Sequence, residues 1–132
     1  MLRKMMRAKI HRATVTECDV DYVGSITIDA DLLRASGIAP NESVWVLDVD
    51  NAARFETYVI RGEPGSGVIG INGAAARLVE PGHKVLIVCF GLLTDDRVDD
   101  HESKVIVVDE NNRIDRELTY SSLIDPIAEP VI

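Results

Sequence analysis

Short aliphatic segments, broken by frequent turns, constrain the fold of this chain more than any other feature. Gly, Pro, Asn or Asp separates most of these segments, which is typical of strands in an all-β domain. The predicted strands are 9–16, 25–28, 44–49, 54–61, 68–71, 84–90 and 104–109. Only 29–36 and 72–78 suit helices, and both are too short for a doubly wound α/β fold. We therefore expect a mainly β fold, a small closed barrel with short helices.

The same order of elements occurs twice in this pattern: strand, short helix, Pro-containing turn, strand. Ile28 in the first unit corresponds to Ile71 in the second, and Val44 corresponds to Val85. The agreement fits an internal duplication, and it equally fits the chance recurrence of common elements.

Residues 95–132 differ in character from the rest of the chain. They begin with an acidic connection, and 104–109 is predicted to be the last strand. The tail from Ser121 contains Pro126 and Pro130 and is expected to fray or to pack on a neighbour. Because 132 residues suit one compact domain, we expect this part to be a C-terminal extension of a single domain.

The chain is acidic overall, with a formal net charge of −8. A nucleic-acid-binding protein needs a cationic field to displace counterions from phosphates, so this charge opposes nucleic acid as a partner. The first dozen residues are an exception, because no acid precedes Glu17. The cations there are Arg3, Lys4, Arg7, Lys9 and Arg12. Such a local concentration of positive charge suits a small anionic substrate.

The sequence predicts neither a secreted nor a membrane protein. No apolar core of a signal peptide follows the basic start. The longest apolar stretch, 85–93, is far shorter than the roughly 20 residues that span a bilayer. Cys18 and Cys89 lack the spacing of metal ligands, and no histidine–carboxylate spacing indicates a metal site. We therefore expect reduced thiols, no metal and a cytoplasmic location.

Gly24–Ser25 is the first candidate for chemistry. A serine hydroxyl attacks the carbonyl before it when the backbone is strained and the oxyanion is stabilised, and the amide then becomes an ester. Elimination and hydrolysis convert that serine into a pyruvoyl group and release ammonia. Gly24 would permit the unusual backbone and the close approach that this attack needs. Taken alone, a Gly-Ser step at the start of a strand is more often a simple turn.

Asn72–Gly73 is the second candidate. An Asn amide and free backbone N–H groups at the start of a helix can hold an oxyanion or a carboxylate. The small residues Gly73, Ala74 and Ala75 leave room for a ligand against the backbone. The competing interpretation is a tight turn, for which Asn-Gly is a preferred dipeptide.

The predicted strand 54–61 carries Arg54, Thr57 and Tyr58. Arg54 and Tyr58 share one face, whereas Thr57 points to the other. For all three to line one site, the strand must twist or a second subunit must contribute. Taken singly, a solvated arginine and a half-buried tyrosine are the more common roles.

The three histidines are weaker candidates than these residues. His11 is more often a structural hydrogen-bonding partner than a catalyst, and the alternation of 9–16 places it on the same face as Lys9. His83 and His101 lie in polar turns and are expected at the surface.

Taken together, these motifs resemble the family of pyruvoyl-dependent aspartate 1-decarboxylases. The motifs that fit in order and spacing are Lys9-x-His11-Arg12, Tyr22-x-Gly24-Ser25, Ile28-Asp29, Arg54-x-x-Thr57-Tyr58, Gly65-Ser66 and Asn72-Gly73-Ala74-Ala75-Ala76. The resemblance runs from Met1 to about Leu93 without an evident gap. It implies a double-psi β-barrel and a homotetramer with active sites between subunits. It also implies self-cleavage between Gly24 and Ser25, into a β chain of residues 1–24 and an α chain of residues 25–132.

The resemblance implies a reaction as well. L-Aspartate would be decarboxylated to β-alanine and CO2 for pantothenate biosynthesis, with the pyruvoyl group from Ser25 as the covalent cofactor. Tyr58 would protonate the product carbon as a general acid. Arg54 and Lys9 would hold the substrate carboxylates.

The remaining implied roles are contacts. Substrate would also touch Thr57, Gly73, Ala74 and Ala75. Thr57 and Asn72 would stabilise the oxyanion during cleavage, and His11 and Tyr22 are second-rank site candidates.

Two alternatives remain open from the sequence. A small swapped β-barrel of the transcription-regulator type also has short βαβ units and dimerises, although it leaves Gly24–Ser25 with Asn72 unexplained and has the wrong charge. A decarboxylase-like protein that never matures would keep an uncut chain and show no turnover.

Overall fold

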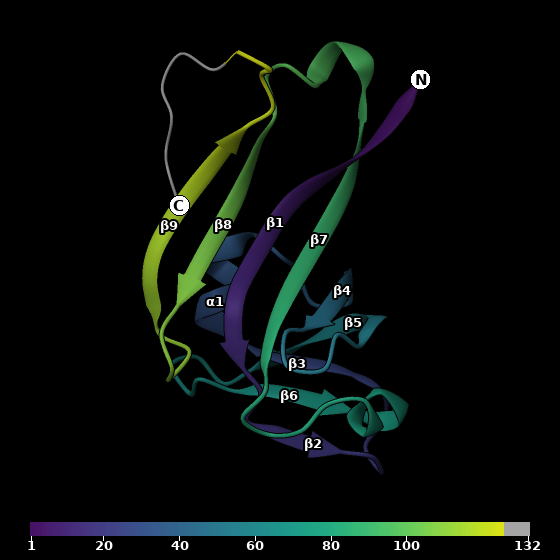
Figure 1. Cartoon of the computed structure of the whole chain (residues 1–132), viewed down its shortest axis with the longest axis vertical. Coiled ribbons are helices and arrows are strands. Elements are labelled where there is room, and N and C mark those ends of the chain that lie inside the picture. The colour runs from purple at the N-terminus through teal and green to yellow at the C-terminus, as the bar shows by residue number, and fades with distance from the viewer. Residues whose placement is uncertain (126–132) are drawn as a thin grey trace.

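The computed structural model describes residues 1–125 and consists mainly of β-strands (Figure 1). The strands are β1 (Leu2–Thr14), β2 (Glu17–Asp19), β3 (Ser25–Asp29), β4 (Ser43–Asp48), β5 (Arg54–Gly62), β6 (Ile69–Asn72), β7 (Lys84–Thr94), β8 (Glu102–Val108) and β9 (Ile114–Ser121). The helices are α1 (Ala30–Ser36) and two 3-10 helices, η1 (Gly73–Arg77) and η2 (Asp95–Arg97). The predicted mainly β fold with short helices is confirmed.

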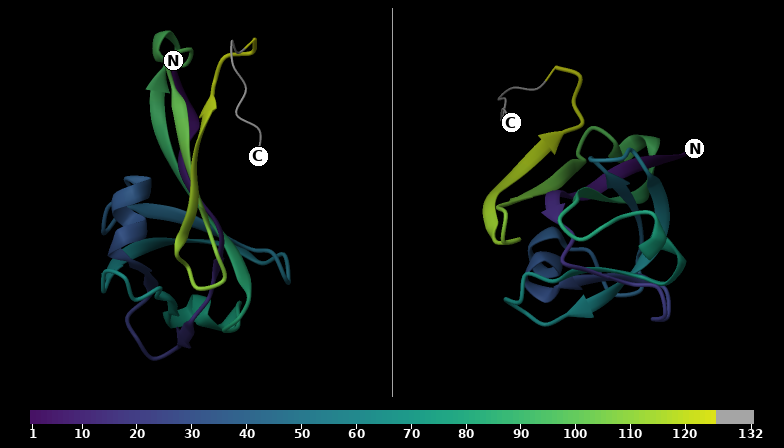
Figure 2. Two further views of the ribbon diagram at one scale, coloured as in Figure 1. Left: turned by 90° about the vertical axis from the view of Figure 1, so that its left-hand side faces the viewer. Right: turned by 60° about the horizontal axis from the view of Figure 1, so that its bottom comes forward.

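The strands form one curved sheet in the order β2-β6-β3-β5-β4-β7-β1-β8-β9. Within residues 1–125 this order has two ends, β2 and β9. Three of the pairings are parallel, namely β1 with β8, β2 with β6 and β3 with β5. Figure 2 shows the long strands β1, β7, β8 and β9 projecting as an arm beyond the body that contains α1. The first strand therefore lies inside the sheet, between two strands from the second half of the chain.

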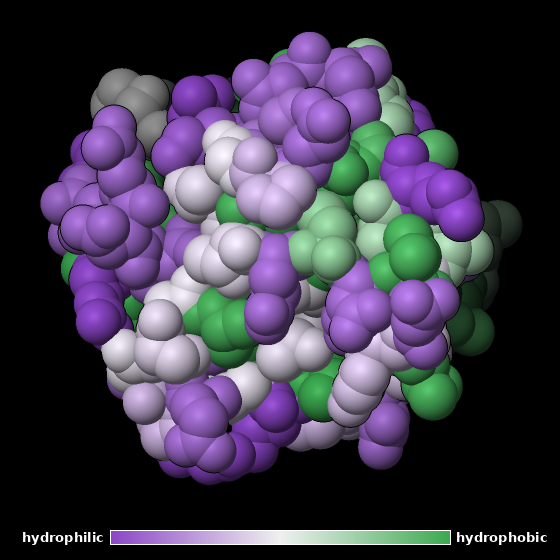
Figure 3. Space-filling model, turned by 90° about the horizontal axis from the view of Figure 1, so that it is seen from below, coloured by the Kyte–Doolittle hydropathy of each residue, from purple (hydrophilic) through white to green (hydrophobic). Residues whose placement is uncertain are grey.

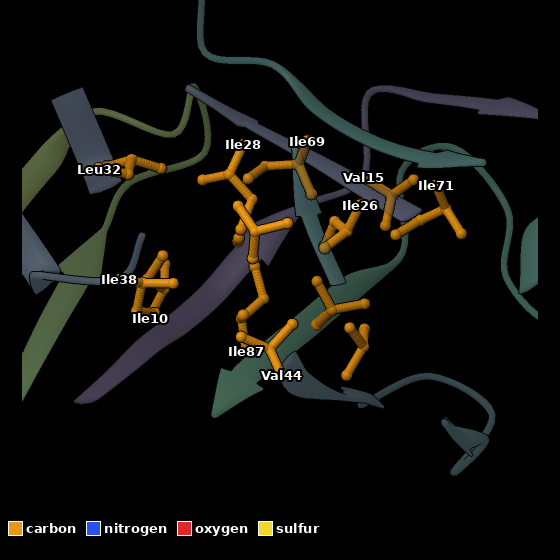
Figure 4. Packing of buried hydrophobic residues seen from close by; sticks show 14 of the residues in the cluster. Ile10, Val15, Ile26, Ile28, Leu32, Ile38, Val44, Ile69, Ile71 and Ile87 are labelled. Carbon is orange, nitrogen blue, oxygen red and sulfur yellow. The ribbon is translucent and has the colours of Figure 1, made fainter. Parts of the chain in front are cut away.

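The core is built from aliphatic side chains on one face of these strands. Ile10, Ile26, Ile69 and Ile87 have no exposed surface, and Figure 4 shows such residues from several strands meeting in one cluster. Burying an aliphatic side chain of this size contributes about 1.5–3 kcal/mol. This burial determines which face of each strand points outward.

Asp29 starts α1 and also holds a loop that is distant in sequence. Its carboxylate accepts hydrogen bonds from the backbone N–H groups of Asp31 (2.8 Å), Gly65 (3.0 Å) and Gly67 (2.8 Å). Burial alone would raise the pKa of Asp29, but these donors outweigh it and hold the pKa below its ordinary value. The helix ends at Gly37, which has a φ of 80°. The helix that the sequence predicts after Asp29 is confirmed.

Several predicted boundaries are wrong. β1 begins at Leu2 and β7 continues to Thr94, because these two strands pair with each other as far as that end. β9 follows the strand that was predicted to be last, and its residues are mostly exposed, so it lacks the alternation that marks a half-buried strand. β2 is a short strand that the sequence pattern did not predict. Pro126 and Pro130 lie outside the described residues, so the expectation for the tail stays a prediction there.

The turn between β8 and β9 is fastened to the rest of the fold by Asn112. This side chain is buried, and its residue has a φ of 60°. Its Oδ1 accepts a hydrogen bond from the N–H of Thr14 (2.7 Å), and its Nδ2 donates to the carbonyls of Thr14 (2.9 Å) and Gly67 (2.7 Å). One amide thus joins the β8–β9 hairpin to β1 and to the loop that Asp29 holds.

Candidate active site

Ser25 is the first residue of β3 and lies between strands β6 and β5. On one side it pairs with Asn72, the last residue of β6. On the other side Ile26 pairs with Val59 in parallel register, so one step back along both strands places Tyr58 beside Ser25. The fold therefore brings Ser25, Tyr58 and Asn72 together in one row across three strands.

The side chain of Asn72 is directed at Ser25. An Asn just before a helix commonly accepts a hydrogen bond from the first turn, but Asn72 makes no such bond to η1. Its Nδ2 instead donates to the Oγ of Ser25 and to the Oγ1 of Thr27, both at 3.1 Å. Asn72 and Ser25 are both buried. This buried amide therefore orients the serine hydroxyl.

The backbone is unusual at Ser25 rather than at Gly24. Ser25 has a φ of 121°, a region that residues other than glycine rarely adopt and that costs on the order of 1–3 kcal/mol. Gly24 is not among the glycines with positive φ, and a Cβ added to it would meet nothing within 4 Å. The expectation that Gly24 supplies the unusual backbone is therefore wrong, and the strain lies one residue later.

Gly73 packs directly against Gly24. It has a φ of 68°, and a Cβ built on it would lie 2.8 Å from the Cα and 3.1 Å from the N of Gly24. Real Cβ atoms do not approach backbone atoms this closely, so only glycine fits at position 73 without displacing its neighbour.

Other predicted residues surround this place. Thr57 precedes Tyr58 on β5 and is half-buried, and Ala74 and Ala75 follow Gly73 in η1. Tyr58 and Tyr22 are 39% and 49% exposed. Both tyrosines are therefore accessible to a ligand from solvent, whereas Ser25 is buried. We call Gly24, Ser25, Tyr58, Asn72 and Gly73 the cleavage group.

Lys9 lies elsewhere, on the outer face of the sheet. The strand register aligns Lys9 with Val88, and Val88 with Trp45. Residues directly opposite each other on paired strands point to the same side. Val46, the next residue after Trp45, has no exposed surface and points into the core, so Trp45, Val88 and Lys9 point away from it.

An open hollow of about 480 Å³ lies on this outer face. It is lined by Lys4, Trp45, Leu47, Arg54, Val88 and Phe90. The Nζ of Lys4 lies 4.9 Å from the centre of the Phe90 ring, a favourable cation–π distance. We call these six residues together with Lys9 and His11 the cationic face. Viewed from below in Figure 3, hydrophobic residues are gathered mainly in the centre and on the right, the side on which β4 and β5 lie in Figure 1.

Burial and neighbouring charges lower the pKa values of two residues on the cationic face. Burial lowers the pKa of Lys9. Burial, and then the positive charges of Lys9, Arg12 and Arg116, lower the pKa of His11, so its imidazole is neutral at pH 7. His11 shares the face of Lys9, as the alternation predicts, because their partners on β8 are two residues apart. This region is electropositive and suits an anion.

The predicted site residues thus fall into two groups within one chain. Arg54 and Tyr58 are four residues apart on one strand, which corresponds to about 13 Å. Lys9 lies on β1, and β7 and β4 separate it from β5 by about 14 Å of strand spacing. Among residues 1–125, no hydrogen bond joins Lys9, His11 or Arg54 to the cleavage group. The structure therefore does not assemble the two groups into one site within one chain.

Sequence reasoning missed a cluster beside the β4–β5 turn. The Nδ1 of His83 lies 2.7 Å from the Oδ2 of Asp48, and this hydrogen bond raises the pKa of His83. Asp50 is close enough for the three side chains to hold a metal ion, but its carboxylate already accepts the N–H of Lys84 at 2.8 Å. The cluster fastens the turn to β7. His83 and His101 are partly exposed, in line with their prediction as surface residues, but both also make hydrogen bonds that the sequence did not predict.

No short sequence motif could have revealed this cluster, because Asp48 and His83 are far apart in the chain and meet only through the pairing of β4 with β7. In the part of the chain that the structure describes, residues 1–125, no helix is long and apolar enough to cross a membrane.

Comparison with known proteins relates the whole arrangement to one family. The family model for aspartate decarboxylase matches residues 1–115. An aspartate 1-decarboxylase of Bacillus cereus (strain G9842) is 60% identical over 114 residues, which are 86% of this chain and 90% of that protein. Those of Bacillus cereus (strain B4264) and Bacillus thuringiensis (strain Al Hakam) are 59% and 57% identical over the same shares. The match continues past Leu93, where the resemblance found in the sequence ends, and includes β8.

Proposed function

Because the chain belongs to the aspartate decarboxylase family, we propose that it converts L-aspartate to β-alanine and CO2 with a pyruvoyl group made from its own Ser25. Membership makes the chain a carboxy-lyase and sets aside the DNA-binding alternative. The observation that carries the proposed cofactor is the environment of Ser25. Its backbone is strained and its hydroxyl accepts a hydrogen bond from Asn72. The preceding residue, Gly24, packs against Gly73.

The proposed cleavage proceeds in three steps. The Oγ of Ser25 attacks the carbonyl carbon of Gly24, the C–N bond breaks, and the nitrogen takes up the hydroxyl proton, which leaves an ester and a free amine. Loss of the Cα proton expels the Gly24 carboxylate and leaves dehydroalanine. Water then replaces the nitrogen, which leaves as ammonia. Thr57 and Asn72 are proposed to stabilise the oxyanion of the first step.

The surroundings of Ser25 fit a pyruvoyl group. The position is buried and is held by strands on both sides, so a group formed there would be fixed in place and shielded from water. When present, that group supplies an electron sink that lets the α-carboxylate leave as CO2. Tyr58, beside Ser25 on β5, is proposed to donate the proton that the product carbon takes up.

Arg54 and Lys9 are proposed to hold the two carboxylates of the substrate. A guanidinium fork matches a carboxylate bidentately, and Lys9 adds a second positive charge on the same cationic face. Thr57 and the backbone of Gly73, Ala74 and Ala75 are proposed to contact the substrate near Ser25, with Tyr22 and His11 as secondary contacts.

These roles require assembly, because Arg54 and Lys9 lie far from Ser25 in their own chain. We propose a homotetramer of double-psi barrels in which the cationic face of one subunit meets the cleavage group of its neighbour. The open apolar hollow beside Arg54 supports this, since an exposed apolar surface bordered by charges is typical of an interface. Each subunit would be one domain made of chains 1–24 and 25–132, with 95–132 as its C-terminal extension. Pantothenate synthesis in the cytoplasm stays a prediction.

An intact-mass spectrum of the purified protein under denaturing conditions tests the cofactor. We expect a fragment of 24 residues and one of 132 − 24 = 108 residues, the larger being lighter by one ammonia than a chain that begins with serine. A single uncut mass that persists after prolonged warm incubation would contradict self-cleavage and support a protein that never matures.

Mixing two inactive variants tests the shared site. Ser25→Ala removes the cofactor from one chain, and Arg54→Ala removes the cation from the other. If sites are shared, co-expression of the two chains restores activity in roughly a quarter of the sites. If each chain holds a complete site, no mixed assembly can recover activity. Separately expressed chains mixed only in the assay are the control.

A further inference from the structure

Asn72 and Gly73 are adjacent residues, and between them they contact both sides of the bond before Ser25. Asn72 donates a hydrogen bond to the Oγ of Ser25, the proposed nucleophile, at 3.1 Å. Gly73 lies against the Cα and N of Gly24, whose carbonyl that nucleophile attacks. One dipeptide therefore holds the attacking group with a side chain and the attacked residue with bare backbone.

We infer that Gly73 is a positioning residue for self-cleavage: its missing side chain lets Gly24 sit where the Ser25 hydroxyl can reach the carbonyl carbon. This role is separate from the substrate contact proposed above, because it acts before any substrate can react. The inference rests on the proposed self-cleavage.

The space around Gly73 shows how strict this requirement is. A Cβ there would lie 2.8 Å from the Cα of Gly24, whereas ordinary contact begins at 3.4 Å, so Gly24 would have to move by about 0.6 Å. The same Cβ would lie 3.1 Å from the N of Gly24 and 3.4 Å from the carbonyl oxygen of Tyr22. These are backbone atoms, which cannot turn away as the end of a flexible side chain can.

A displacement of this size acts directly on the first step of cleavage. The Ser25 hydroxyl is held on β3 by Asn72, so a displacement of Gly24 misaligns its carbonyl carbon with the Oγ. Misplacing a reacting group by about 1 Å can slow a reaction about 100-fold. Elimination and hydrolysis follow only after the ester has formed, so slower ester formation slows the whole cleavage reaction.

The chain offers a matched control for backbone strain. Gly82 also has a left-handed φ, 93°, but a Cβ added to it would meet nothing within 4 Å. Gly82→Ala therefore places alanine in a strained backbone in the same way as Gly73→Ala, without pressing on Gly24. Any difference between the two variants in cleavage is due to the contact and not to the strain.

The experiment follows cleavage of wild type, Gly73→Ala and Gly82→Ala by intact mass after synthesis, each with and without hydroxylamine. At neutral pH hydroxylamine cuts the ester before Ser25, and the fragment masses distinguish this cut from one at Asn72–Gly73, a bond that alkaline hydroxylamine also attacks. The fragments cut before Ser25 therefore report how far the first step has gone. We expect Gly82→Ala to cleave like wild type and Gly73→Ala to cleave about 10- to 100-fold more slowly, with no ester for hydroxylamine to cut. A merely structural role would lower the melting temperature of both variants and leave the partition between amide and ester unchanged.

Three results would overturn the inference. The first two are cleavage of Gly73→Ala at the wild-type rate and accumulation in this variant of an ester that hydroxylamine cuts. If Gly73→Ala fails to fold, Gly73→Asn is used, because Asn tolerates positive φ better and carries the same Cβ. Failure of both to fold would assign Gly73 to the fold rather than to cleavage. An uncut wild-type chain would instead refute the proposed self-cleavage itself.

Discussion

The cleavage group and the cationic face have opposite characters. Ser25 and Asn72 are buried, and the contacts that hold them all lie within one chain. Arg54 and Lys4 border an open hollow on the outside of the sheet, where nothing from the same chain covers them in the part that the structure describes, residues 1–125. In the proposed function, a single chain thus carries all that maturation requires, whereas turnover also requires a neighbour.

Ser25→Ala tests this division most severely. Without the Oγ, we expect an uncut chain of 132 residues and complete loss of decarboxylation, while the cationic face and the assembly stay unchanged. Intact mass, an assay of β-alanine formation and sedimentation measure these three properties. Ser103→Ala, which alters another buried serine, should still be cut. Activity in Ser25→Ala would remove the pyruvoyl group from the mechanism.

Tyr58→Phe separates turnover from cleavage inside the cleavage group itself. The variant should be cut normally, because Ser25 and Asn72 are untouched, but kcat should fall by about 10²- to 10⁴-fold when the general acid is lost. Tyr120→Phe on β9 serves as the control. Turnover at the wild-type rate would take the proton-donating role from Tyr58.

Arg54→Ala acts on the cationic face alone. Loss of a charge-assisted hydrogen bond should raise KM for L-aspartate by about 10- to 100-fold and leave the rate of cleavage unchanged. Arg61→Ala removes an exposed arginine farther along the same strand and should change neither quantity. If Arg54→Ala slowed cleavage instead, the two groups would not be independent.

Asp29→Asn tests the scaffold beneath the cleavage group, since Asp29 ends the strand that Ser25 begins. The neutral amide of Asn accepts hydrogen bonds from the N–H groups of Asp31, Gly65 and Gly67 more weakly than the carboxylate does. The free energy of unfolding should therefore fall by about 1–2 kcal/mol. Because the folded pKa of Asp29 is depressed, its contribution is present above the unfolded pKa of about 3.9 and is lost as pH falls through the folded value. Denaturant titrations from pH 2 to pH 7 should show this loss in wild type and a flatter profile in the variant. An unchanged profile would contradict the role of Asp29.

His83→Gln should have the smallest effect on stability. His83 lies outside the cleavage group, where β4 meets β7. The folded pKa of His83 is raised by its hydrogen bond to Asp48. Its stabilising contribution is therefore complete below the unfolded pKa of about 6.5 and is lost as pH rises through the higher folded value. Melting temperatures between pH 5 and pH 9 should show this loss in wild type and not in His83→Gln. The control variant His101→Gln should show the same loss of melting temperature with rising pH as wild type.

The sequence was most informative where the chemistry depends on neighbours in the chain. Gly24–Ser25 and Asn72–Gly73 are adjacent pairs, and the structure places these two pairs against each other. Helix α1 was also foreseen, because its cap Asp29 and its terminal Gly37 are local signals. The location of the strain was not, since whether Gly24 or Ser25 adopts positive φ depends on how β3 pairs with β6.

What the sequence could not show depends on contacts distant in the chain. β9 has a mostly exposed surface, so its pairing with β8 and not its own pattern makes it a strand. The bond between His83 and Asp48 likewise exists only because β4 and β7 are paired. The alternation of Arg54, Thr57 and Tyr58 predicted that Thr57 faces away from the other two, so that a twist of the strand or a second subunit would be needed. It did not predict the separation of Arg54 from Tyr58, which share a face and are kept apart by their spacing along β5.

The position of β1 has a consequence for the life of the molecule after cleavage. Residues 1–24 supply an inner strand of the sheet, held between β7 and β8 by non-covalent pairing alone once the chain is cut. Unfolding would then release two separate polypeptides, and recovery would require them to meet in solution. Refolding of an uncut subunit, before assembly, is independent of concentration, whereas even this step would slow with dilution for the cut molecule. Self-cleavage would thus make thermal unfolding effectively irreversible, whereas the uncut chain could refold.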